Sequence, residues 1–263
     1  MSAAIPTDAV RLLVVGAACG GVLALAESFR FLRLLRPEET RKLVHVLMGL
    51  IAATFPWVFR SSWTVAALCA AFGGLMAWSR KRHALLSVNG VARRSWGGVY
   101  FPLAIAIVFP LARERPEWFV ASILVLAVSD AVAAVAGQAC GRHVYRMGPD
   151  PKSLEGSLAF FASALACVYV PLSVIAPAAT ADHLWQAAYA AIVATCLEGA
   201  ASDGRDNLFI PLGTCLTLVC VAEGGACRQV VAALALALTV GAAWRVVSPV
   251  RPVGPPNVAV GES

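Results

Sequence analysis

The chain has 263 residues, of which 59% are hydrophobic and only 14% are charged. Soluble domains carry about 25% charged residues, so this composition excludes an ordinary soluble protein. The net charge of +6 does not indicate a nucleic-acid partner, because the basic residues stand beside apolar segments, as membrane-orienting charges do. We therefore expect one membrane domain over residues 1–263.

The apolar runs predict an all-α, polytopic membrane protein with seven to nine transmembrane helices, since roughly 20 apolar residues cross a bilayer. The first eight residues lack the basic region of a signal peptide, so the first helix is expected to be retained. Residues 249–263 are rich in proline and glycine and are expected to form a disordered tail. The predicted spans are 9–28, 43–59, 62–79, 96–112, 117–137, 157–177, 183–200, 207–222 and 229–247.

Lysine and arginine alternate in density from one predicted loop to the next. They concentrate after the first, third, fifth and seventh spans, whereas the other side holds only Arg11, Arg60, Arg113, Arg115 and Arg228. The positive-inside rule then places the N-terminus outside and the charged loops in the cytoplasm. Every cluster of chemically active residues described below falls at one of these cytoplasmic ends.

The first cluster lies at the entry to the second span. Pro37 suits a first helical position. Arg41 and Lys42 lie four and three residues before His45, so all three share one helix face near the membrane surface. Arg41 and Lys42 could serve only as membrane anchors, with His45 as a core residue. Together the three also suit an anionic ligand.

The second cluster lies at the end of the fifth span. Asp130 within an apolar helix costs about 2.5–3.5 kcal/mol on insertion, so it normally has a cationic partner or a functional reason. Ala133, Gly137 and Gly141 follow at intervals of four on the same side. Such a stripe of small residues allows another backbone, or a ligand, to approach closely.

The third cluster precedes the sixth span. We interpret Asp150 as an N-cap and Pro151 as a first helical residue, which places Lys152 and Ser153 in the first turn. The free N–H groups of a helix N-terminus bind phosphate, and Lys152, Ser153 and Ser157 would add a charge and hydroxyl groups. An ordinary capped helix with a local ion pair is the alternative interpretation.

Carboxylates and one amide recur at these same ends of the predicted helices. Glu155 lies three residues after Lys152, close enough to pair with it or to hold a metal ion. Hard oxygen ligands of this kind suit Mg²⁺, which takes one or two carboxylates together with substrate phosphates. The candidate magnesium ligands are Asp130, Glu155, Glu198, Asp206 and Asn207.

In combination these motifs resemble the phytol kinase and dolichol kinase family. The matching pieces are Arg41-Lys42-x-x-His45, Asp130 with Gly137 and Gly141, Lys152-Ser153-Leu154-Glu155-Gly156-Ser157, and Glu198 with Asp206-Asn207-Leu-x-x-Pro211. The members of this family are integral membrane enzymes that phosphorylate isoprenoid alcohols, commonly with CTP. The CTP-dependent diacylglycerol kinases are similar, and the CDP-diacylglycerol synthases are more distant.

The resemblance implies that Asp130, Gly137, Gly141, Lys152 and Glu155 line a nucleotide site. We therefore expect a lipid kinase that takes a nucleoside triphosphate and a lipid alcohol, such as phytol, a polyprenol or diacylglycerol. Magnesium would be held by Asp130 with Glu155 or Asp206. Lys152, helped by Arg41 or Lys42, would neutralise the charge on the phosphates. Either His45 or a carboxylate would accept the hydroxyl proton.

Two other functions are compatible with the same residues. A lipid cytidylyltransferase would release pyrophosphate from CTP, but that class typically carries a His-Gly-Gly run followed by an Asp-Arg pair, and no His-Gly-Gly occurs here. A transporter would also use polar groups at interrupted helices, and would consume no triphosphate. The product released from the triphosphate distinguishes a kinase, a cytidylyltransferase and a transporter.

Overall fold

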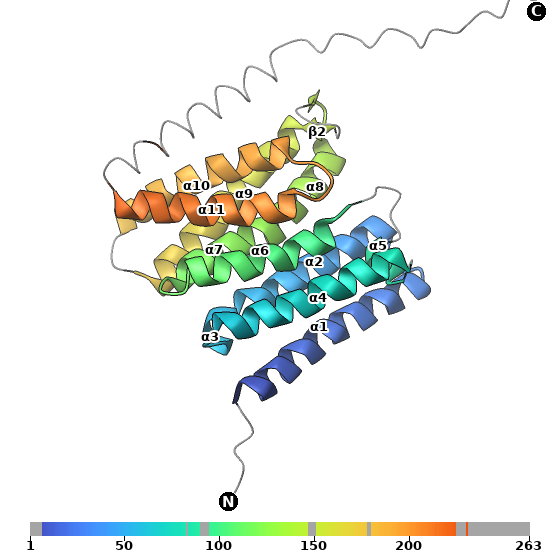
Figure 1. Cartoon of the computed structure of the whole chain (residues 1–263). Coiled ribbons are helices and arrows are strands. Elements are labelled where there is room, and N and C mark those ends of the chain that lie inside the picture. Colours follow the sequence, from blue (N-terminus) through green and yellow to red (C-terminus); the bar gives the residue numbers. More distant parts are fainter. Residues whose placement is uncertain are drawn as a thin grey trace, which may run out of the picture.

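The computed structural model describes residues 7–82, 84–89, 95–146, 151–177, 180–224 and 230. Almost all of these lie in helices that run side by side (Figure 1). The helices are α1 (Thr7–Phe31), α2 (Pro37–Ala53), α3 (Phe55–Val58), α4 (Ser62–Lys81), α5 (Leu86–Asn89), α6 (Gly97–Leu111), α7 (Pro116–Leu124), the π-helix η1 (Val125–Ser129), α8 (Asp130–Cys140), α9 (Leu154–Ile175), α10 (Thr180–Ala200) and α11 (Asp206–Glu223). Two short strands, β1 (Val144–Tyr145) and β2 (Lys152–Ser153), complete the described elements.

The predicted all-α membrane class is confirmed. Five helices are long and apolar enough to cross a membrane: Asp8–Phe31, Pro37–Val58, Ser62–Lys81, Pro116–Cys140 and Leu154–Ile175. The predicted spans 96–112 and 207–222 correspond to shorter apolar helices, and 183–200 corresponds to α10. The span 229–247 and the tail 249–263 lie outside the described residues, apart from residue 230, so the total of seven to nine stays a prediction.

Helix α9 holds the centre of the core, where it packs against α7, α8 and α10. Its Phe160 is fully buried, as are Phe119 and Ile123 of α7. Helix α11 packs on α10, α6 and α7, while α4 packs on α6 and α1 packs on α2. In Figure 1 the loop after α1, the hairpin strand β2 and the end of α8 all lie at the same end of the bundle.

A π-helical segment interrupts the predicted fifth span just before its aspartate. Helices α7 and α8 are continuous through η1, and Asp130 is the first residue after it. One extra residue in a turn rotates everything that follows around the helix axis, and such segments are frequent at functional sites. The segment packs tightly on α2, because a Cβ atom added to Gly49 would overlap Ala127. Glycine at residue 49 thus brings α2 and the Asp130 region together.

The entry to α9 differs from the prediction. Lys152 and Ser153 do not lie in a helical turn but form β2, which pairs antiparallel with β1 in the register Val144↔Ser153 and Tyr145↔Lys152. The N-cap is Ser153, whose hydroxyl accepts a hydrogen bond from the Gly156 N–H at 3.1 Å. The predicted cap, Asp150, lies outside the described residues. The prediction was wrong because the backbone of these residues finds partners across the hairpin before the helix begins.

Gly49→Ala should destabilise the protein by about 1–3 kcal/mol, because the added methyl group cannot fit against Ala127 without separating α2 from η1. Thermal unfolding in one detergent would measure this. Gly74→Ala in α4 is the matched control, since its Cβ atom meets nothing within 4 Å and should be neutral or stabilising. Equal melting temperatures for the two variants would contradict the close packing.

Candidate functional site

The predicted site residues converge on one cavity of about 790 Å³ at the loop end of the bundle. Most of its lining comes from the starts of α2, α6, α9 and α11, from α4 and the end of α10, and from most of α8. Helices α1 and α5 and the two strands add a few residues. Predicted site residues that line it are Arg41, Lys42, His45, Asp130, Gly137, Gly141, Lys152, Ser153, Ser157, Glu198, Asp206 and Asn207. Segments more than 150 residues apart in the chain thus meet around one space, as the loop pattern predicted. The assignment of this end to the cytoplasm stays a prediction.

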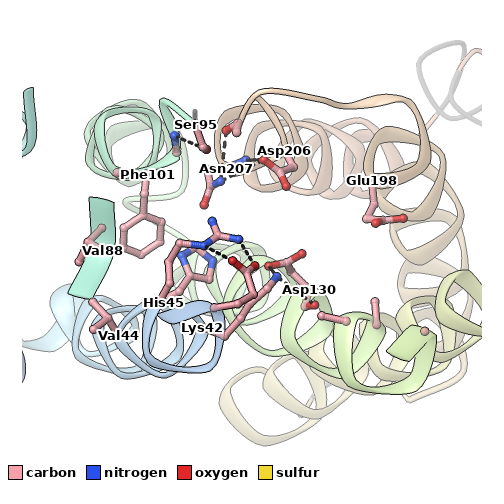
Figure 2. A pocket seen from close by; sticks show the side chains of 18 of the residues that line it. Lys42, Val44, His45, Val88, Ser95, Phe101, Asp130, Glu198, Asp206 and Asn207 are labelled. Carbon is pink, nitrogen blue, oxygen red and sulfur yellow. Dashed lines mark hydrogen bonds and ion pairs between the residues drawn. The ribbon is translucent and has the colours of Figure 1, made fainter. Parts of the chain in front are cut away.

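An ion pair between Lys42 of α2 and Asp130 of α8 forms one side of the cavity. The Lys42 Nζ donates to a carboxylate oxygen of Asp130, and it lies 3.5 Å from the Asp130 backbone oxygen (Figure 2). Both side chains are largely buried, at 20% and 16% exposure. The cationic partner that the sequence required for Asp130 is therefore Lys42. Arg41 pairs instead with Glu38, one turn back on the same helix.

A second ion pair, between Lys152 of β2 and Glu198 of α10, also lines the cavity. Glu198 is only 4% exposed, and its second oxygen, Oε2, is buried without a hydrogen-bond partner. Burial lowers the pKa of Lys152, but the nearby Glu198 carboxylate more than offsets it, so the pKa of this ammonium group is raised above its ordinary value. Lys152 is therefore a fixed positive charge at neutral pH.

His45 lies between charged side chains and aromatic or apolar side chains that line the cavity. Its ring packs at 5.1 Å from the Phe101 ring, and its Nε2 atom is buried with no hydrogen-bond partner. Figure 2 shows His45 close to Lys42 and Asp130 on one side and to Phe101 on the other. A buried polar atom without a partner is rare and calls for an explanation, such as a bound ligand.

The start of α11 closes the cavity opposite Asp130. Asn207 is buried, and its side-chain amide donates to the Gly204 carbonyl at 3.1 Å and to the Asp206 carboxylate at 3.0 Å. Gly204 has a φ of +83° and touches Gly97, where a Cβ atom at either glycine would clash. This contact seats the N-terminus of α6 beside Asp206 and Asn207.

The small residues of α8 pack against the N-terminus of α9. A Cβ atom on Gly137 would lie 3.1 Å from the Ser153 hydroxyl, and one on Gly156 would lie 3.1 Å from the Ala133 carbonyl and 3.4 Å from the Gly137 Cα. The close approach that the stripe predicted is therefore confirmed, with the start of α9 as the partner. The approach holds Lys152 near the Asp130 side of the cavity.

Glu155 is the one predicted site residue that does not line the cavity. Its carboxylate accepts hydrogen bonds from the His143 side chain at 2.7 Å and from the His143 backbone at 3.3 Å. The expected pairing with Lys152, three residues away, was wrong because β2 precedes the helix and directs Lys152 toward Glu198. Glu155 therefore ties the β1–β2 hairpin to α9.

Two predicted phosphate ligands also have internal partners. The Ser153 hydroxyl caps α9, and the Ser157 hydroxyl lies 2.6 Å from the hydroxyl of Tyr145. Both residues still line the cavity. Their first contribution is to fix the start of α9 directly after Lys152.

The carboxylates fit a magnesium ion that is held largely by a ligand. Within the described part of the chain no three His, Cys, Asp or Glu side chains are close enough to form a metal site unaided. Asp130, Glu198 and Asp206 nevertheless face the same cavity (Figure 2), and Glu198 keeps one unpartnered oxygen. Mg²⁺ accepts one or two carboxylates plus phosphates, so this donor set fits it when a phosphate ligand is bound.

Arg80 is a site residue that was not predicted, because from the sequence it is only one of the orienting charges after the third span. Arg80 lines the cavity from the last turn of α4, donates to the Ser95 carbonyl at 2.6 Å and stacks 4.0 Å above the Trp96 ring. A basic residue in the last turn of an apolar helix is the normal membrane anchor. Nothing in the sequence therefore distinguished it.

Glu198→Gln should make Lys152 more reactive toward an amine-modifying reagent at pH 9. The substitution removes the charge that raises the Lys152 pKa and leaves the burial that lowers it, so more free amine is present at a given pH. Competitive labelling followed by mass spectrometry would measure the rate, with the exposed Lys81 as the internal control. An unchanged or slower Lys152 rate would show that Glu198 does not hold this charge.

The comparisons with known proteins agree with this geometry. The chain is 33% identical to phytol kinase from Synechocystis sp. over 200 residues, which is 75% of this chain and 85% of that protein. No protein-family model matches, and no solved structure matches. An identity of this extent over most of both sequences shows common descent, and the chain belongs to the phytol kinase family.

Proposed function

We propose that the protein transfers the terminal phosphoryl group of a nucleoside triphosphate, CTP by preference, to a lipid alcohol at the cytoplasmic face of the membrane. The observation that carries this proposal is the meeting of two lysine–carboxylate pairs, Lys42–Asp130 and Lys152–Glu198, in one cavity. The relative's name supplies the acceptor class, since phytol is a lipid alcohol. The nucleotide, the metal and the membrane face are parts of the proposal that rest on the site's chemistry and the loop charges.

Positioning and charge neutralisation are what phosphoryl transfer demands of a protein. Lys42 and Lys152 both line the cavity, so each can exchange its carboxylate partner for a phosphate oxygen. The N–H groups at the start of α9 add partial positive charge beside Lys152. Asp130, Glu198 and Asp206 would then be available to hold Mg²⁺, which would supply further neutralisation of the phosphate charge.

Phosphoryl transfer also requires that the hydroxyl group of the acceptor alcohol lie beside the phosphates. His45 lies one turn beyond Lys42 on α2 and faces the same cavity. Its unpartnered Nε2 atom and the nearby carboxylates are the groups that can accept the hydroxyl proton.

The deciding assay uses the purified protein in lipid nanodiscs with Mg²⁺, terminally labelled CTP or ATP, and a panel of lipid alcohols. A kinase places the label in the lipid and releases nucleoside diphosphate. Release of labelled pyrophosphate would instead identify a cytidylyltransferase. Flux into sealed liposomes without triphosphate consumption, measured in parallel, would identify a transporter.

Lys152→Met should lower kcat by about 10²–10³-fold, because it removes a buried cation that stabilises the charge of the transition state. Lys81→Met is the matched control, since Lys81 is exposed at the end of α4, and it should retain full activity. Both variants would be assayed for label transfer after equal recovery in nanodiscs. Full activity of Lys152→Met would remove the central role given to this lysine.

Glu155→Gln should reduce kcat much less than Glu198→Gln. Glu155 contacts His143 outside the cavity, whereas Glu198 faces the cavity and pairs with Lys152. The same label-transfer assay compares the two isosteric changes, and each removes one charge. A larger loss from Glu155→Gln would mean that Glu155 acts on the substrate directly, as the sequence first indicated.

A further inference from the structure

The cavity has a charged half and an apolar half. The apolar half, here called the apolar wall, consists of Leu23, Val44, Met48, Phe72, Val88 and Phe101. Figure 2 shows Val44, Val88 and Phe101 gathered on one side, while Asp130, Asp206 and Glu198 occupy the other. The phosphates of a nucleoside triphosphate and their metal ion use only the charged half. The apolar wall therefore requires a second occupant.

The position of the apolar wall favours a hydrocarbon chain as that occupant. Its residues come from α1, α2, α4, α5 and α6, and α1 and α4 also carry exposed apolar side chains on their outer faces, such as Leu25 and Leu75. The wall is thus part of the lipid-facing group of helices. The total volume, about 790 Å³, is near the top of the range of about 300–1,000 Å³ for small-ligand sites, so there is room for a second ligand.

His45 stands where the two halves of the cavity meet. Its ring contacts Phe101 of the apolar wall, and its Nε2 atom is fully buried without a partner inside the described protein. Lys42, which pairs with Asp130, lies three residues earlier on the same helix. A molecule with a hydroxyl group at the end of an apolar chain would satisfy this nitrogen and bury its chain at the same time.

We propose that the apolar wall binds the hydrocarbon tail of the acceptor alcohol and that His45 Nε2 forms a hydrogen bond with its hydroxyl group. This inference rests on the proposed function and adds the place and orientation of the acceptor. The hydroxyl is then held at the edge of the charged half, next to the Lys42–Asp130 pair. In Figure 2 Val88 lies on the other side of Phe101 from His45, so a larger side chain at residue 88 would leave less space for a long tail.

Val88→Phe tests the tail site by filling part of the space beside the apolar wall. The KM for eicosanol should rise about tenfold or more, while the KM values for decanol and for the nucleotide should not change. Val135→Phe is the matched control, because Val135 is 69% exposed on α8 and does not line the cavity. Equal effects of Val88→Phe on both alcohols, or on neither, would overturn the tail site.

A binding experiment tests the hydroxyl contact without any need for activity. Liposomes containing the protein would be irradiated with a diazirine-labelled hexadecanol, and the labelled peptides would be located by mass spectrometry. Labelling of α2, α4 or α6 at the apolar wall, reduced more by unlabelled eicosanol than by eicosane, is the expected result. His45→Phe should abolish this preference for the alcohol.

The two experiments separate this inference from the proposed function. Wall labelling and alcohol preference in a protein that transfers no phosphate would refute the kinase and retain the alcohol site. Phosphoryl transfer with labelling confined to other helices, or with no preference for the alcohol over the alkane, would refute the alcohol site and retain the kinase.

Discussion

Two buried ion pairs determine where the helices of this protein must meet. A lysine or an aspartate in an apolar helix costs about 2.5–3.5 kcal/mol on insertion, so each needs a partner of opposite charge. Lys42 and Asp130 satisfy this need between α2 and α8, and Lys152 and Glu198 satisfy it between β2 and α10. Removing one member of a buried pair typically costs about 3–5 kcal/mol. The same charges that a phosphate and a metal ion would use therefore hold the site in shape.

Much of the site was predictable because its residues follow two regular patterns, the alternation of positive charge between loops and the spacing of residues on one helix face. Positive charge alternated from loop to loop, which placed the motifs of the second, fifth, sixth, seventh and eighth spans at one end of the bundle. The i, i+3 and i, i+4 spacing then placed Arg41, Lys42 and His45 on one face of α2, and all three line the cavity. The glycine stripe of α8 likewise predicted the close contact that Gly137 makes with the start of α9.

The remainder was not predictable because it depends on local backbone geometry and on partners distant in sequence. Spacing along a helix suggested that Glu155 could pair with Lys152. The pairing of β2 with β1 instead places Lys152 before the helix, where its partner is Glu198, 46 residues away. The π-helical turn before Asp130 has no sequence signature of its own. Arg80 could not be told apart from an ordinary membrane anchor, since its role depends on Ser95 and Trp96.

The proposed chemistry requires that Lys42 and Lys152, 110 residues apart in the sequence, lie in the same binding site for a triphosphate. Amine-reactive labelling of the purified protein during titration with CTP and Mg²⁺, without any alcohol, tests this most directly. Protection of both lysines with a single midpoint, and none of Lys81, is the predicted result. Protection of only one of the two lysines, or two clearly different midpoints, would contradict the shared cavity.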